Sequence, residues 1–204
     1  REFLPKHIRR VLILGPGLEI LNGVVGLEAS MQMYEPFALI DLLLRYRLAD
    51  RTNLRIDLLD LNPEVIRHTR EALDRAAEGR DYTLDVTLDE SLAEEGRLVR
   101  QFDFFGNALG ALKTDLTGAD RLDLPRRRLS IPPEVVKMLR PIKGDAIVDR
   151  FSPDEAYDLV VCFNTMVYWS EAERVLAGIN IRSALRSGGV FLTDNVFAPP
   201  GGRA

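Results

Sequence analysis

Short apolar runs that end abruptly on glycine or on a polar residue recur along this chain. Residues 11–14 read "VLIL" and are closed by Gly15-Pro16-Gly17, and residues 157–163 read "YDLVVCF" and are closed by Asn164. Runs of this length, bounded by turn residues, are typical of buried parallel strands. Segments with apolar residues at helical spacing lie between them. This alternation predicts an α/β fold with a doubly wound, mostly parallel sheet of the Rossmann-like type.

The individual elements follow from the same patterns. The segment "YEPFALIDLLLRYRL" predicts a helix with Pro36 in its first turn, and "NLRIDLLD" predicts a second strand that ends on Asp60. Asn62 and Pro63 form a good cap and first position for the next helix, which we expect to run to Gly79. Later, a helix is expected over residues 170–185, then a turn at Gly188-Gly189 and a strand in "VFLTD".

Residues 82–88 alternate between apolar and polar side chains, which predicts a half-exposed strand. Residues 89–140 have no simple pattern, and we interpret them as an insertion within a single domain that covers residues 1–204. Loops carry specificity in many enzymes, so we expect the insertion to flank the side of a ligand pocket where a substrate would bind. The chain stops soon after the last predicted strand, so we expect either a truncated fragment or a short sheet without a terminal antiparallel hairpin.

Composition excludes several classes of function. The 204 residues carry a net charge of −4 with both signs interspersed, which gives no electrostatic footprint for nucleic acid. One cysteine and two distant histidines make a dedicated metal site unexpected. Apolar runs are too short to span a membrane. We therefore expect a cytoplasmic protein, and the sequence leaves its oligomeric state open.

Ligands of doubly wound sheets bind beyond the carboxyl ends of the strands. The predicted strand ends are Gly15 to Gly17, Asp60, the region of residues 144–145, and Asn164. Asp60 is expected to accept ribose hydroxyls or to cap the following helix, and both roles are compatible. Asp60 lies 43 residues after Gly17 rather than about 20, and the third glycine of a dinucleotide fingerprint is absent, which counts against a nicotinamide cofactor.

Several stretches together resemble one family. "CFNTMVYW" is similar to the Cys-x-Asn-x-x-Ile-Tyr-Phe segment of the chemotaxis-receptor glutamate methyltransferases, the CheR type of class I S-adenosylmethionine-dependent methyltransferase. "YEPFALIDLLL", "LLDLNPEVI", "PPEVVKMLRPIKGDAIV" and "LRSGGVFL" are similar to further segments of that family, in the same order. The resemblance extends from about residue 11 to residue 195.

The resemblance implies a binding site for S-adenosylmethionine and no metal. Glycine residues of the first turn would approach the cofactor, a carboxylate would hold the ammonium group of its methionine end, and an aromatic hydroxyl would face its methyl group. The residues implied are Gly15 and Gly17 at the turn, Glu35 at the ammonium, Asp60 at the ribose, Asp145 and Ala146 at the adenine, Asn164 beside the cofactor, and Tyr168 as the catalytic residue. Asp85 is the alternative acid for the end of the third strand.

The implied reaction is methyl transfer to an acceptor that the sequence does not identify. A carboxylate of a protein side chain is already ionised at neutral pH and needs no general base, and a small molecule is the other possibility. Phe163 stands where this family usually has an arginine, so a glutamate side chain is not specified as the acceptor. A non-catalytic cofactor-binding module and an NAD-dependent oxidoreductase are the alternative functions.

Overall fold

The structure is a computed structural model that describes residues 7–20, 31–87, 102–116, 126–151 and 156–194. The chain divides into two compact units. The first unit comprises residues 1–17, 46–70 and 138–204, and the second comprises residues 18–45 and 71–137.

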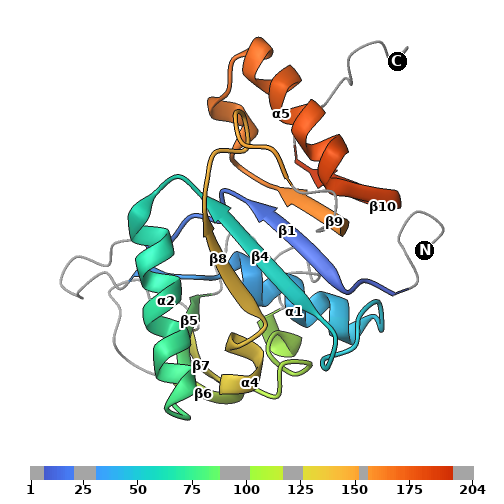
Figure 1. Ribbon diagram of the computed structural model, residues 1–204. Coiled ribbons are helices and arrows are strands. Elements are labelled where there is room, and N and C mark those ends of the chain that lie inside the picture. The colour runs from blue at the N-terminus through green and yellow to red at the C-terminus, as the bar shows by residue number, and fades with distance from the viewer. Residues whose placement is uncertain (1–6, 21–30, 88–101, 117–125, 152–155, 195–204) are drawn as a thin grey trace, which may run out of the picture. The chain divides into compact units, whose positions relative to one another are not determined.

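The first unit contains a five-stranded sheet in which every pair of neighbours is parallel (Figure 1). Its strands are β1 (Arg10–Leu14), β4 (Arg55–Asp60), β8 (Leu139–Lys143), β9 (Tyr157–Cys162) and β10 (Leu185–Thr193). They lie in the order β10-β9-β1-β4-β8. The chain thus builds outward from β1 in one direction and then returns to build in the other, which is the doubly wound arrangement. The predicted fold class is confirmed.

Burial explains why these runs became strands. Every residue of β9 is buried, and four of the five residues of β1 are buried, as expected for central strands covered on both faces. Val11 aligns with Leu159 and Ile13 with Val161 across the β1–β9 pair. A cluster of buried residues on one face of the sheet, including Leu12 and Val160, packs with Ile181 of helix α5 (Glu171–Ala184).

Both helices that contribute to the first unit have strong end signals. Ser170 precedes α5, and its hydroxyl and the Glu173 side chain form a reciprocal capping box. Helix α2 (Pro63–Ala77) begins after Asn62, whose side-chain oxygen accepts a hydrogen bond from the Glu64 N–H at 3.0 Å. Beyond its last turn, Gly79 has a φ of 79°, a conformation that ends helices. Residues 63–70 of α2 belong to the first unit and its later residues to the second.

The second unit is built differently. Strands β5 (Tyr82–Thr87), β7 (Arg126–Ile131) and β6 (Leu112–Leu116) form an antiparallel sheet in the order β5-β7-β6. A short pair, β2 (Glu19–Ile20) and β3 (Met31–Gln32), and helices α1 (Glu35–Arg45) and α4 (Pro133–Val136) complete its regular elements. Buried side chains tie these elements together: the Gln32 amide exchanges two hydrogen bonds with the backbone of Asp85, at 2.7 and 3.0 Å.

Two details differ from the pattern-based expectations, and the structure also decides between Asp85 and Asp145 as the acid that follows the third strand. The strand over residues 82–87 exists, but it pairs in the antiparallel sheet, and its Asp85 carboxylate accepts two hydrogen bonds from Arg128 at 2.7 and 2.8 Å. The third strand of the parallel sheet is β8, which is followed by Asp145. Gly188 and Gly189 lie within β10 at an irregularity of register, not between a helix and a strand. Residues 195–204, where a terminal hairpin is in question, lie outside the described residues, as do parts of the 89–140 segment.

Candidate functional site at the carboxyl edge of the parallel sheet

The carboxyl ends of β1, β4, β8 and β9 lie along one edge of the first unit's sheet. β1 and β9 are the neighbours between which the order of the strands changes direction, so the chain leaves their ends toward opposite sides. Such a switch opens a crevice in which doubly wound proteins bind ligands. Of the residues predicted to end strands, Gly15 directly follows β1, Asp60 is the last residue of β4, and Asn164 lies two residues after the end of β9.

The glycine turn after β1 contains two residues in the left-handed region, Gly15 with a φ of 63° and Gly17 with a φ of 61°. The two positions differ in the space available for a side chain. A Cβ on Gly15 would lie 2.5 Å from Oγ1 and 2.8 Å from Cγ2 of Thr165, so packing against Thr165 requires a glycine at this position. A Cβ on Gly17 would meet nothing within 4 Å, so the space beside Gly17 is open.

Replacing these two glycines by alanine should therefore give unequal losses of stability. Gly17→Ala carries only the cost of a left-handed alanine, about 1–2 kcal/mol. Gly15→Ala adds an overpacking cost of about 1–3 kcal/mol, because Thr165 has to move. Urea unfolding followed by the fluorescence of Trp169, the single tryptophan and a member of the first unit, measures both losses. Equal losses would contradict the packing role of Gly15.

The Asp60 carboxylate organises the turn from the next strand. Its Oδ2 accepts a hydrogen bond from the Gly17 N–H at 3.3 Å, and its Oδ1 accepts one from the Asn62 N–H at 2.8 Å. Gly15 N–H also donates to the Leu59 carbonyl at 2.8 Å. Each carboxylate oxygen has two lone-pair sites, so Asp60 has acceptor capacity beyond these two bonds. It is only partly buried and can present that capacity to a ligand.

The turn after β9 is strained and tied to its neighbours. Asn164 has a φ of 52°, which is uncommon for a residue other than glycine, and its N–H donates to Oδ2 of Asp194 at 2.9 Å. The Thr165 hydroxyl lies 3.2 Å from the Leu14 carbonyl oxygen, 3.2 Å from that of Gly15 and 3.0 Å from that of Phe163. A held, uncommon backbone conformation at a strand end is typical of a functional turn.

The aromatic pair that follows divides into a packed ring and an exposed one. Met166 to Tyr168 form a single 3₁₀ turn, in which Met166 is fully buried. Trp169 packs against the core cluster on the α5 face of the sheet. The Tyr168 side chain is 82% exposed. Core packing therefore accounts for Trp169, but it does not account for Tyr168.

The loop after β8 continues the same edge. The Gly144 N–H donates to the Asp60 carbonyl at 3.2 Å, which joins this loop to the end of β4. Asp145 Oδ1 accepts from the Ile147 N–H at 2.8 Å, so part of its acceptor capacity is used within the loop. Ala146 is buried in the core cluster. Asn180 of α5 holds the loop through its amide, which donates to the carbonyls of Ala146 and Ile147 at 3.1 and 2.8 Å.

Thr165, Asn180 and Asp194 contribute to this edge and were not anticipated from the sequence. Asn180 carries one weak signal, because asparagine is unfavourable within a helix unless its side chain has a partner. Glu35 is the first residue of α1 and belongs to the second unit, so its proposed contact with the cofactor remains a prediction.

Within the described ranges, no three His, Cys, Asp or Glu side chains gather in a way that could hold a metal ion. None of the described helices has both the length and the apolar character needed to cross a membrane.

Two solved structures resemble this chain in overall path. One is the glycopeptide N-methyltransferase MtfA, with 16% sequence identity and a TM-score of 0.42, over 90% of this chain and 45% of that chain. The other is a TehB-like SAM-dependent methyltransferase from Corynebacterium glutamicum, with 15% identity and a TM-score of 0.39, over 91% of this chain and 54% of that chain. This chain thus spans about half the length of each. No family model and no curated protein matches it. Similarity at this level does not assign the chain to a family.

Proposed function

We propose that the first unit binds S-adenosylmethionine at the carboxyl edge of its parallel sheet and that the protein transfers the cofactor's methyl group to an acceptor. One observation carries this proposal. The turn at Gly17, which has open space beside it, is hydrogen-bonded to the Asp60 carboxylate, and this turn follows β1 where the strand order changes direction. A nucleoside needs close backbone approach together with a carboxylate for its ribose hydroxyls. The sequence resemblance to class I methyltransferases supports the choice of this nucleoside.

The residues present fit the cofactor's ribose. Asp60 retains lone-pair sites on both oxygens after its bonds to Gly17 and Asn62. Open space beside Gly17 lets a ligand approach the backbone without meeting a side chain. Asp145 and Ala146 follow β8 on the same edge and are proposed to contact the adenine. Ala146 would do so through its backbone, because its side chain is only 6% exposed.

When bound, the cofactor would supply a methyl group on a sulfonium, from which the neutral thioether is a good leaving group. The protein's contribution is to position the acceptor and to keep water away from the reacting atoms. We assign Tyr168 to positioning, because its exposed phenol can donate a hydrogen bond to an incoming oxygen. Asn164 lies beside the cofactor in this proposal. The acceptor is a carboxylate of a protein side chain or a small molecule.

Calorimetry with S-adenosylmethionine and NAD, side by side, tests the proposal. We expect the wild-type protein to bind S-adenosylmethionine and Asp60→Ala to bind it about tenfold to a hundredfold more weakly, because hydrogen bonds to a charged group contribute about 1.5–3 kcal/mol. Asp50→Ala is the matched control, since Asp50 is an exposed aspartate before the amino end of the same strand. Its affinity should equal that of the wild type.

Binding of NAD in place of S-adenosylmethionine would overturn the proposal, and so would equal affinities of the wild type and Asp60→Ala. A separate assay distinguishes an enzyme from a binding module. An enzyme forms S-adenosylhomocysteine when an extract that contains the acceptor is added, whereas a module binds the cofactor and forms no product.

A further inference from the structure

The amino ends of the five parallel strands form a second edge of the first unit's sheet, opposite the carboxyl edge. The described segments that begin these strands or lead into them are residues 7–10, 46–57, 138–140, 157–158 and 182–187. They hold eight arginines and three aspartates, a formal charge of +5, whereas the whole chain has a net charge of −4. We call this surface the arginine edge. Its charged residues are Arg9, Arg10, Arg47, Arg51, Arg55, Arg140, Arg182 and Arg186, with Asp50, Asp57 and Asp158.

Backbone hydrogen bonds bring the loop before β4 against the start of β1. The Ile8 N–H donates to the Leu48 carbonyl at 2.7 Å, and the Arg55 N–H donates to the Arg9 carbonyl at 2.8 Å. The exposed arginines of this loop therefore lie close to the exposed Arg9. Charges of both signs are interspersed along the sequence, so it is the fold that gathers the arginines on one edge.

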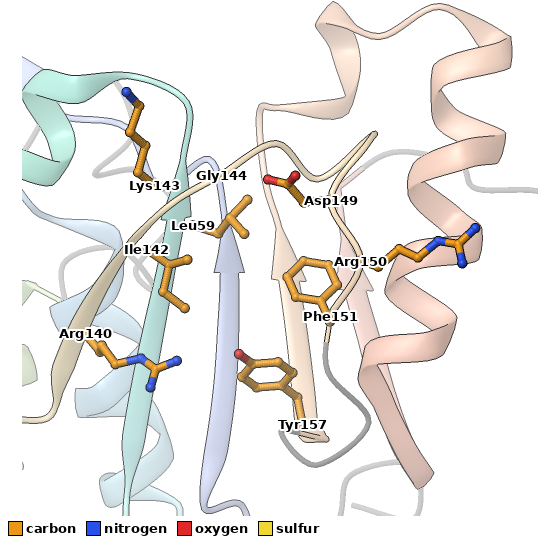
Figure 2. A pocket seen from close by; sticks show the side chains of 9 residues that line it. All are labelled: Leu59, Arg140, Ile142, Lys143, Gly144, Asp149, Arg150, Phe151 and Tyr157. Atoms are coloured by element: carbon orange, nitrogen blue, oxygen red, sulfur yellow. The ribbon is translucent and has the colours of Figure 1, made fainter.

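Two of the three acids on the arginine edge are buried within the sheet. Asp158 is 4% exposed, accepts two backbone hydrogen bonds from the start of β1 at 2.6 and 2.8 Å, and pairs with Arg186. Asp57 is fully buried, with its Oδ1 3.3 Å from Nε of Arg140. Figure 2 shows the Arg140 guanidinium extending toward Tyr157 near the amino ends of the strands. The charge that the arginine edge presents to solvent is therefore mainly that of its arginines.

From these observations we infer that the arginine edge binds an acidic segment of a partner protein, which lies extended across the strands. Neighbouring strands are about 4.8 Å apart, so five strand starts span roughly 19 Å, the length of about six extended residues. Arginine suits carboxylates because its planar fork can donate two parallel hydrogen bonds. The arginines that are exposed make the contacts in this inference, and they are Arg9, Arg47, Arg51, Arg182 and Arg186.

Single-stranded nucleic acid fits the arginine edge less well. Sites for single strands combine basic side chains with aromatic rings on which successive bases stack. Among the described residues of the arginine edge, Tyr46 is the one exposed ring, and the other ring, Tyr157, is buried. Acidic side chains lie at the opposite ends of β4, β8 and β10 and disfavour an anion longer than the edge. The inference does not depend on whether the carboxyl edge binds S-adenosylmethionine.

Titration calorimetry at low ionic strength tests the inference with a capped peptide of eight glutamates, and a capped peptide of eight glutamines is the matched ligand. We expect the glutamate peptide to bind, the glutamine peptide to bind at least about tenfold more weakly, and added salt to weaken the binding of the glutamate peptide. The double variants Arg47→Gln/Arg51→Gln and Arg9→Gln/Arg182→Gln should each weaken it about threefold to tenfold. All four side chains are exposed, so the fold should be unaffected, and circular dichroism checks this.

The matched control is Arg70→Gln/Arg150→Gln, which removes two exposed arginines of the same unit that lie outside the arginine edge. Its affinity for the glutamate peptide should stay within about twofold of the wild type. Equal weakening by the control would show a general charge effect and overturn the inference. No binding of the glutamate peptide, equal binding of the two peptides, or an effect of only one edge variant would also overturn it. Tighter binding of an eight-nucleotide oligothymidylate than of the glutamate peptide would assign the edge to nucleic acid instead.

Discussion

Asp57→Ala should lower the free energy of unfolding of the first unit by about 3–5 kcal/mol, the range for removing one partner of a buried ion pair. Asp57 is fully buried in the middle of β4. Its Oδ1 lies 3.0 Å from Nε of Arg55 and 3.3 Å from Nε of Arg140, and its Oδ2 accepts the Tyr157 hydroxyl at 2.8 Å. Alanine would leave the buried phenol without this acceptor and the two arginines without their shared counter-charge.

The two arginine side chains are 40% and 42% exposed and can turn toward water, so the lower end of the range is expected. Tyr157→Phe is the matched comparison, because it removes one hydrogen bond and leaves the ion pairs, at a cost of about 1 kcal/mol. Urea unfolding followed by Trp169 fluorescence reports on this unit. A loss below about 1 kcal/mol for Asp57→Ala would show that the cluster is not a major source of stability.

The second unit should lose stability steeply at alkaline pH. Burial raises the pKa of Tyr82 to about 12, and this outweighs the hydrogen bond from the Met33 N–H and the charge of Arg75, which lower it. In the unfolded chain the phenol ionises near its ordinary pKa of about 10. Between these two values the folded protein therefore binds more protons than the unfolded chain, and stability falls as pH rises.

The expected loss from Tyr82 is about 2–3 kcal/mol between pH 10 and pH 12, since one pKa unit corresponds to about 1.4 kcal/mol. In Tyr82→Phe the free energy of unfolding should not show this decrease between pH 10 and pH 12. The variant should also lose some stability at neutral pH, because the Met33 N–H loses its acceptor. Burial also raises the pKa of Tyr34, with Glu19 and Asp41 acting in the same direction, so the variant keeps a residual slope. Urea unfolding at a series of pH values gives the comparison. Parallel curves for the two proteins would refute the assignment to Tyr82.

The strands that the sequence predicted most clearly are those whose burial is continuous. β1, β4 and β9 occur where apolar runs indicated them, and α5 differs from its predicted bounds by one residue at each end. For β8 the sequence predicted only a strand end in the region of residues 144–145, because Pro141 and flanking basic residues interrupt the apolar pattern of the strand itself. Proline is tolerated there since β8 is an edge strand of the sheet and one of its sides needs no donors.

The location of the candidate site could be predicted from local signals because carboxyl ends of parallel strands share one edge. The contacts that hold it could not. The Thr165 hydroxyl bonds to the carbonyl of Leu14, and the Asn180 amide bonds to the carbonyl of Ala146. Both contacts join residues that are far apart in the sequence, so no local pattern indicates them. The alternation in residues 82–87 predicted a strand, but alternation does not specify which sheet the strand joins.

The place of β1 at the centre of the sheet has a consequence for biosynthesis. β1 leaves the ribosome early relative to its neighbour β9, which belongs to a much later part of the chain. Thr165, which closes the turn over the end of β1, follows Leu14 by 151 residues. At about 5–20 residues per second, its synthesis takes roughly 8–30 s after that of Leu14. During this interval the edge of β1 that faces β9 has no native partner, which leaves an apolar strand edge open to non-native pairing.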